Sequence, residues 1–296
     1  MGNQAIESVT QLLRDNNPMR GETIQEMRAN MDASTGLMPL PDDVVYTPVQ
    51  IAGLAAEWTE APEVAVDRVI LYFHGGGYTI GSIATHRQVV ADLSRAAGVR
   101  VLSVGYRLGP EDPHPAAVED AVAAYRFLLS LDIEPGHIAF AGDSAGGGLT
   151  VAALIAVRDA RLPLPAAGVC ISPWLDLTQS GDSYETRAAE DPLVSKSMLD
   201  LMSAAYLDGQ DPRQPTASPI FAKLEGLPPI LIQVGTAEVL LDDSLRFAEA
   251  GKTAGVDVEL QVWDDMIHVW HCFAALIPQG GEAITKIAVY LEQKFS

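Results

Sequence analysis

The spacing of hydrophobic and polar residues along the chain predicts strands and helices in alternation. Residues 67–73 and 100–106 are short runs rich in valine and leucine, which is typical of strands. Between them, residues 87–97 have the spacing of a helix that ends at Gly98. This part of the chain is therefore predicted to form a strand, a helix and a second strand.

The alternation continues toward the C-terminus. Val118, Val122, Tyr125 and Leu129 recur at helical spacing and form one apolar stripe. The elements predicted after this helix are strands at 137–142, 167–172, 229–234 and 256–263 and helices at 145–159, 242–254 and 282–294. Strands that alternate with helices predict an α/β fold with a mostly parallel central sheet flanked by helices.

Two parts of the chain fall outside this alternation. Helical patterns at 5–14 and 22–31 are separated by Pro18, and a further helix is predicted at 196–206 between two polar loops. We expect these parts to form a helical cap on a single core. The expected division is cap at 1–40 and 176–216 and core at 41–175 and 217–296.

Composition narrows the class of protein. The 296 residues are 48% hydrophobic and 20% charged, so the chain can bury a large core. A formal net charge of -20 argues against a nucleic-acid partner, which requires clustered Lys and Arg.

Residues 1–10 lack a signal-peptide pattern, and no run approaches the ~18 apolar residues of a membrane span, so a cytoplasmic location is expected. Cys170 and Cys272 lack metal or redox spacing and are expected to be buried free thiols.

A Gly-Asp-Ser-Ala-Gly motif at 142–146 lies between a predicted strand and a predicted helix, the context of a nucleophile elbow. The sharp turn strains the serine backbone and leaves no room for side chains two residues to either side. Gly147 and Gly148 are expected to let the helix pack closely on the sheet. A chance match in a glycine-rich chain is the alternative, and the strand-turn-helix setting favours Ser144 as a nucleophile.

A His-Gly-Gly-Gly motif at 74–77 follows the strand predicted at 67–73. Glycines at such a place allow backbone N–H groups to approach the oxyanion that develops on a substrate carbonyl. A plain turn or a phosphate loop is the alternative. A phosphate loop needs a nearby Lys and a Ser or Thr at P-loop spacing, and the motif has neither.

A nucleophilic serine needs a base that is neutral near pH 7, and histidine is the side chain that titrates there. The chain order of this kind of site is serine, acid, histidine, so the base should follow the last strand. The other four histidines, at 74, 86, 114 and 137, all precede Ser144. His268 and His271 remain as candidates.

These motifs resemble those of the hormone-sensitive-lipase-like branch of the α/β-hydrolases, the bacterial family IV esterases. The resemblance covers most of residues 40–296. It is carried by residues 74–78, 106–111, 142–146 and 235–268. It implies the α/β-hydrolase fold, a helical cap, and an oxyanion hole formed by the backbone amides of Gly76, Gly77 and Ala145.

The chain departs from the family pattern at two positions. Gly109 stands where the family usually has alanine, and Asp265 where it has glycine. Met266 and His268 still match the family's G-M-x-H pattern, so the resemblance favours His268 as the base. His271 is then interpreted as a packing or lid histidine.

Three carboxylates follow the strand predicted at 229–234, namely Glu238, Asp242 and Asp243. Matching residues 238–242 to the family's D-P-L-x-D pattern places Glu238 at the catalytic acid, with glutamate in place of aspartate. Asp242 and Asp243 are expected to cap the helix that begins there.

Four further residues near the motifs are given supporting roles. The resemblance implies that Glu111 and Asp143 provide structural hydrogen bonds rather than proton transfer. Met202 and Tyr206 of the cap are expected to be packing residues rather than contacts to the acyl group.

The reaction expected from these residues is hydrolysis of a carboxylic ester through an acyl-enzyme, with Ser144, His268 and Glu238 as the triad and no metal or cofactor. The resemblance implies a small-molecule ester with a short acyl chain, and a homodimer formed through the sheet edge. The alternative is a non-catalytic ligand-binding protein, like the plant gibberellin receptors that resemble this family but have lost the catalytic histidine. The presence of His268 argues against that alternative.

Overall fold

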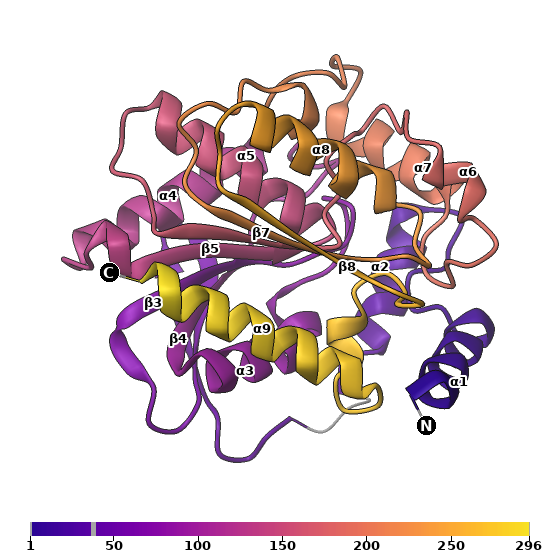
Figure 1. The fold of residues 1–296 in the computed structure, drawn as a ribbon, viewed down its shortest axis with the longest axis horizontal. Coiled ribbons are helices and arrows are strands. Elements are labelled where there is room, and N and C mark those ends of the chain that lie inside the picture. The colour runs from indigo at the N-terminus through magenta and orange to yellow at the C-terminus, as the bar shows by residue number, and fades with distance from the viewer. Residues whose placement is uncertain (1, 37–39, 296) are drawn as a thin grey trace.

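The computed structural model describes residues 2–36 and 40–295, which fold around one eight-stranded sheet (Figure 1). Across the sheet the strands lie in the order β1-β2-β4-β3-β5-β6-β7-β8. Their bounds are β1 Val45–Ile51, β2 Leu54–Glu60, β3 Ala65–Phe73, β4 Val99–Val104, β5 Ile138–Asp143, β6 Ala167–Ile171, β7 Ile230–Gly235 and β8 Val258–Trp263. The strands from β3 to β8 pair in parallel, which confirms the predicted class of fold.

The first two strands form an antiparallel hairpin that the sequence pattern did not predict. β1 is largely exposed and contains Pro48, which cannot donate a ladder hydrogen bond and is typical of an edge strand. β2 pairs with β4, also antiparallel. Because β1 has no buried face of its own until Ile51, it lacks the alternating pattern by which a strand is recognised.

Side chains on successive residues of β3 belong to two separate cores. Val69, Leu71 and Phe73 pack in one core, and Ile70 and Tyr72 pack in the other. This alternation follows from the period of two in a strand, and it explains why a strand buried on both faces is continuously hydrophobic.

Helices cover both faces of the sheet (Figure 1). One core includes side chains from α4, α5 and α8, and the other includes side chains from α3 and α9. The bounds are α3 Ile83–Ala97, α4 Ala116–Ser130, α5 Ala145–Asp159, α8 Leu241–Thr253 and α9 Pro278–Lys294. All five were predicted, with ends that differ by a few residues.

The remaining helices gather at one end of the sheet in Figure 1. They are α1 Gly2–Asp15, α2 Ile24–Ala33, α6 Ser183–Thr186 and α7 Lys196–Leu207, and short 3-10 turns lie at η1 Pro135–His137, η2 Pro219–Phe221 and η3 Trp270–Phe273. The buried faces of α1 and α2 join the same core as α4 and α5. Within residues 2–36 and 40–295, no helix combines the length and apolarity needed to cross a bilayer.

Candidate active site

Ser144 lies in the turn between β5 and α5 with a strained backbone, φ 55° and ψ -120°. Its N–H donates to the Ile171 carbonyl at 2.8 Å, which fixes the turn against the end of β6. A side chain at Gly142 would collide with the Gly146 carbonyl, and one at Gly146 would collide with the Phe73 carbonyl. The predicted reason for the flanking glycines is therefore confirmed.

The next two glycines allow close packing on more than the sheet. A Cβ at Gly147 would lie 2.9 Å from the Pro173 Cβ, and one at Gly148 would meet the Trp174 carbonyl and the Tyr78 hydroxyl. Both glycines thus allow α5 to pack against the loop after β6 and against Tyr78. The expected close packing on the sheet holds in part for Gly147, whose Cβ would also lie 3.2 Å from the Gly142 carbonyl of β5, whereas Gly148 faces the loop after β6 and Tyr78.

The glycine loop after β3 is a tight turn. Gly76 has φ 114° and Gly77 has φ 58°, a region that favours glycine. The N–H groups of Thr79 and Ile80 donate to the Gly76 carbonyl at 3.0 and 2.9 Å. Within the described chain, the amides of Gly76, Gly77 and Ala145 donate to no other protein group, so they are free to bind an oxyanion.

Buried polar side chains beneath the loop, which include Asp143, fix the position of its backbone by hydrogen bonds. The Asp143 carboxylate accepts hydrogen bonds from the Gly75 N–H at 3.0 Å and from the Tyr72 hydroxyl at 2.6 Å. His86 Nε2 lies 3.3 Å from the same carboxylate. Burial opposes the charge of Asp143, yet His86 and Tyr72 outweigh it and hold the pKa of Asp143 at about 2. The structural role predicted for Asp143 is confirmed.

His86 was missed as part of this support. The helix predicted at 87–97 begins just after His86, whereas His86 lies inside α3 with a buried ring. Burial lowers the pKa of His86, but the charge and hydrogen bond of Asp143 raise it further, so the net shift is upward. No motif in the sequence connects it with Asp143, because the contact joins α3 to the last residue of β5, 57 residues away.

Glu111 also has the structural role that was predicted. Its carboxylate pairs with Arg28 of α2 at 2.7 Å. The Arg28 guanidinium in addition donates to the carbonyls of Thr79 at 2.6 Å and Gly109 at 2.7 Å. A Cβ at Gly109 would lie 2.9 Å from the Ala205 carbonyl, so the glycine found there permits close approach of α7.

The acid and base candidates meet in the loops that follow β7 and β8. His268 Nδ1 lies 2.8 Å from Glu238 Oε2, and both side chains are buried. The second oxygen, Glu238 Oε1, accepts from the Gly235 N–H at 2.7 Å and from the Ser172 hydroxyl at 2.8 Å. A hydrogen bond to Nδ1 leaves Nε2 of the imidazole as the nitrogen that can accept a proton.

The pKa of His268 is shifted by two opposing effects. Burial lowers it, but the hydrogen bond and charge of Glu238, together with the charges of Asp191 and Asp143, raise it above its ordinary value. Asp191 is itself buried and accepts from the N–H of Val239, the residue after Glu238, at 3.0 Å.

His271 lies apart from the carboxylate. Its Nε2 is 2.6 Å from Gln233 Oε1, and burial lowers its pKa to about 3. A histidine that stays neutral and bonded to an amide packs rather than exchanges protons, in line with the interpretation as a packing residue.

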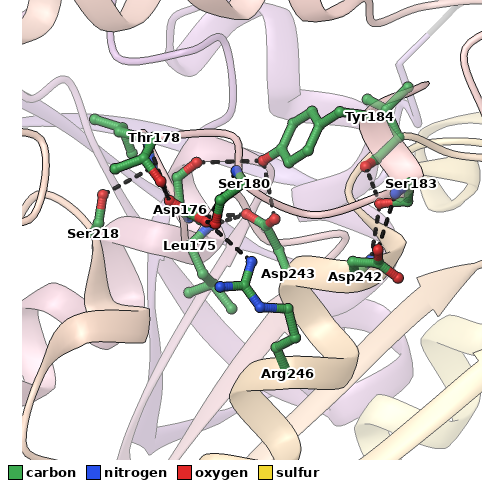
Figure 2. Close-up of polar contacts among 12 residues, drawn as sticks. Leu175, Asp176, Thr178, Ser180, Ser183, Tyr184, Ser218, Asp242, Asp243 and Arg246 are labelled. Carbon is green, nitrogen blue, oxygen red and sulfur yellow. Dashed lines mark hydrogen bonds and ion pairs between the residues drawn. The ribbon is translucent and has the colours of Figure 1, made fainter.

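Asp242 and Asp243 lie in the first turn of α8, as predicted, but they do not cap its N–H groups, so the expected capping was wrong. α8 has no side-chain cap, and both carboxylates point toward residues 175–184 (Figure 2). Asp243 accepts from the amides of Leu175 and Asp176 at 2.8 and 2.9 Å and from the Tyr184 hydroxyl at 2.9 Å. Burial raises the pKa of Asp243 to about 8. The two residues fix the loop after β6 to the start of α8, because that loop presents unpaired N–H groups there.

Helix α7 packs directly on the glycine loop after β3. Met202 and Tyr206 of α7 are buried, and Tyr206 stacks on Tyr78 with ring centroids 4.1 Å apart. A side chain at Gly77 would collide with Met202. Their predicted packing role is confirmed.

A cavity of about 490 Å³ lies elsewhere, and the described residues that line it include no member of the proposed triad or of the glycine loop. It is lined mainly by apolar groups of α1, α2, α3 and η3, including Leu13, Val89 and Phe273. Its lining reaches Thr85, next to His86, and Cys272, four residues after His268. Within the described residues, no hydrogen bond joins the Ser144 hydroxyl to His268, and such contacts often tighten only around a substrate.

Asp265 has φ 63°, in the left-handed region. This explains why the family has glycine at the position: the turn before His268 requires a positive φ, which glycine adopts freely and aspartate tolerates. The Asp265 N–H donates to the Thr236 hydroxyl at 2.8 Å, so the loops after β7 and β8 are bonded to each other.

Comparisons with known proteins agree with this architecture. The sequence profile of the alpha/beta hydrolase fold matches residues 70–272, and the chain belongs to this family. An acetyl-hydrolase of Streptomyces hygroscopicus is 45% identical over 294 residues, which cover 98% of this chain and 97% of the relative.

Solved structures narrow the family further. An esterase from the bacterial hormone-sensitive lipase family superposes with a TM-score of 0.96 at 47% identity, with 99% of each chain covered. EstE5, in a crystal soaked with p-nitrophenyl butyrate, superposes with a TM-score of 0.94 at 45% identity, with 98% of each chain covered. The chain is a hormone-sensitive-lipase-like α/β-hydrolase and a carboxylic ester hydrolase.

Proposed function

We propose that the protein hydrolyses carboxylic esters of small molecules with short acyl chains through an acyl-enzyme on Ser144. The observation that carries the proposal is the buried hydrogen bond of 2.8 Å between Glu238 and His268 Nδ1. The loops of this pair reach the nucleophile elbow through Ser172, which adjoins Ile171, the residue bonded to the Ser144 N–H. Ser144, Glu238 and His268 thus supply the serine, the acid and the histidine of the proposed triad.

In the proposed reaction, Ser144 Oγ attacks the ester carbonyl carbon and His268 Nε2 accepts the hydroxyl proton. The amides of Gly76, Gly77 and Ala145 stabilise the negative oxygen of the tetrahedral intermediate. The intermediate collapses, the alcohol leaves with the proton from His268, and water hydrolyses the acyl-enzyme by the same steps. Glu238 orients the imidazole and stabilises its charged form.

We also infer that α1, α2 and residues 176–216 act as a cap over the site. Asn17 donates to the carbonyl of Leu193 at 2.7 Å, and Arg14 donates to that of Ala189 at 3.0 Å, so the two parts are bonded to each other. Arg28 bonds the first part to the glycine loop. A cap fixed in this way limits the space beside the catalytic residues.

The chain-length limit can be measured with p-nitrophenyl esters from acetate to palmitate. We expect kcat/KM to be highest between acetate and butyrate and to fall at least about tenfold by decanoate, because added methylenes no longer fit under the cap. Rates for the Ser144→Ala protein correct for spontaneous hydrolysis. A maximum at decanoate or longer would contradict a short-chain esterase. The absence of hydrolysis of every ester would instead favour the non-catalytic alternative, which the named esterase relatives do not support.

The pH dependence follows from the raised pKa of His268. The base must be neutral to accept a proton, so activity is present above the pKa of His268 and is lost as the pH falls through it. Because Glu238 and Asp191 raise this pKa, we expect the acid limb of kcat/KM above the ordinary histidine value of about 6.5. A profile of log kcat/KM from pH 5 to 9 measures the limb. A flat profile, or a limb below pH 6, would contradict the assignment.

A further inference from the structure

Ser172 is the first residue after β6, and it lies between the loops of the proposed acid and base. It is fully buried and has φ 45°, a conformation that non-glycine residues rarely adopt. Its N–H donates to the Gln233 carbonyl at 2.7 Å, so the backbone is anchored to β7 independently of the side chain.

The Ser172 hydroxyl makes two hydrogen bonds. It lies 2.8 Å from Glu238 Oε1 and accepts from the N–H of Val269 at 3.1 Å. An N–H can only donate, so the Val269 bond occupies a lone pair and the single hydroxyl proton is left for Glu238. One hydroxyl therefore connects the acid to the residue that follows His268.

We propose that Ser172 is a positioning residue that aligns Glu238 with His268, an inference that rests on the proposed function. Glu238 Oε1 is held by Ser172 and by the Gly235 N–H, which turns Oε2 toward His268 Nδ1. The hydrogen bond from the Val269 N–H to the Ser172 hydroxyl fixes the peptide that follows His268.

The strained backbone at Ser172 and Val269 indicates that the hydrogen bond between these two residues has a specific role. Val269, a β-branched residue, has φ 48°, and it bonds to Ser172, which also has a positive φ. Strained non-glycine residues persist only where surrounding contacts hold them. The hydroxyl thus joins two strained residues across the acid and base loops.

Ser172→Ala removes both bonds and leaves the Gln233 anchor in place. We expect kcat to fall about 10- to 100-fold, since small displacements of a catalytic group cost rates of this order. KM for p-nitrophenyl butyrate should change less than twofold, because the hydroxyl is proposed to act on the triad. Ser172→Gly relieves the backbone strain and also lacks the hydroxyl, so we expect the same loss of kcat.

Ser94→Ala is the matched control. Ser94 is likewise a buried serine that accepts from one backbone N–H, that of Ala61, and donates to a main-chain carbonyl, that of Val99. It bonds to no residue of the proposed triad, so we expect kcat to stay within twofold of the wild type while the thermal midpoint falls about as far as in Ser172→Ala.

A double-mutant cycle with Glu238→Gln separates positioning from general destabilisation. If Ser172 acts through Glu238, Ser172→Ala should lower kcat less than about twofold in the Glu238→Gln background. The same loss in both backgrounds, or full activity of Ser172→Gly, would overturn the proposal. Wild-type kcat in Ser172→Ala beside an inactive Glu238→Gln would overturn the role of Ser172 alone, whereas an active Glu238→Gln would overturn the proposed triad.

Discussion

Ser144→Ala should lower kcat/KM for short esters by about 10⁴-fold or more, because it removes the group that forms the acyl-enzyme. The fold should be unchanged. Ser144 N–H and carbonyl make the hydrogen bonds of the elbow, and alanine retains both. Far-ultraviolet circular dichroism and the thermal midpoint test the fold, and initial rates with p-nitrophenyl acetate test the activity.

Covalent labelling gives an independent test of the same residue. A fluorophosphonate should add one adduct to the wild-type protein, located at Ser144 by peptide mass spectrometry, and none to Ser144→Ala. Hydrolysis at the wild-type rate by a folded Ser144→Ala protein, or labelling at another serine, would refute the nucleophile.

The second large effect is expected for Glu238→Gln, with a fall in kcat of about 10³- to 10⁴-fold. The amide keeps the size of the side chain but removes the charge that stabilises the imidazolium of His268. Because Glu238 raises the pKa of His268 against burial, the acid limb of the residual activity should move to lower pH. Steady-state rates at saturating ester from pH 5 to 9 measure both effects.

Asp242→Asn and Asp243→Asn are the controls, since both carboxylates follow the same strand. Asp242 accepts from the Ser183 N–H at 2.9 Å, and Asp243 bonds to the loop after β6. We expect most of the activity to remain and the thermal midpoint to fall by a few degrees, more for the fully buried Asp243. If Glu238→Gln stays active and Asp242→Asn is inactive, the acid has been assigned four residues too early.

The strands and helices that the sequence predicts best are those with one dominant local signal. β3, β5 and α5 contain nearly continuous runs of buried residues, α3 has one buried face, and the elbow motif lies at the junction of β5 and α5. The exposed β1 has no such spacing and was missed.

The residues that support the site could not be predicted, because their partners are distant in the chain. Ser172 and Glu238 are 66 residues apart, and Gly75 and Asp143 are 68 apart. The family resemblance indicated Asp143 but not Ser172 or His86. Asp242 and Asp243 lay where helix caps occur, and only the fold shows that the loop after β6 offers them other N–H groups.

The bonds between the two parts of the proposed cap have a consequence for folding during synthesis. Ile6, Val9 and Leu13 of α1 are buried, yet Arg14 and Asn17 bond to Ala189 and Leu193. The ribosome therefore releases the apolar face of α1 well over a hundred residues before the segment that helps to hold it. Short helices are marginal in isolation, so this face stays exposed in the nascent chain until that segment emerges. We therefore expect α1 to complete its packing only after the segment that contains Ala189 and Leu193 has been synthesised.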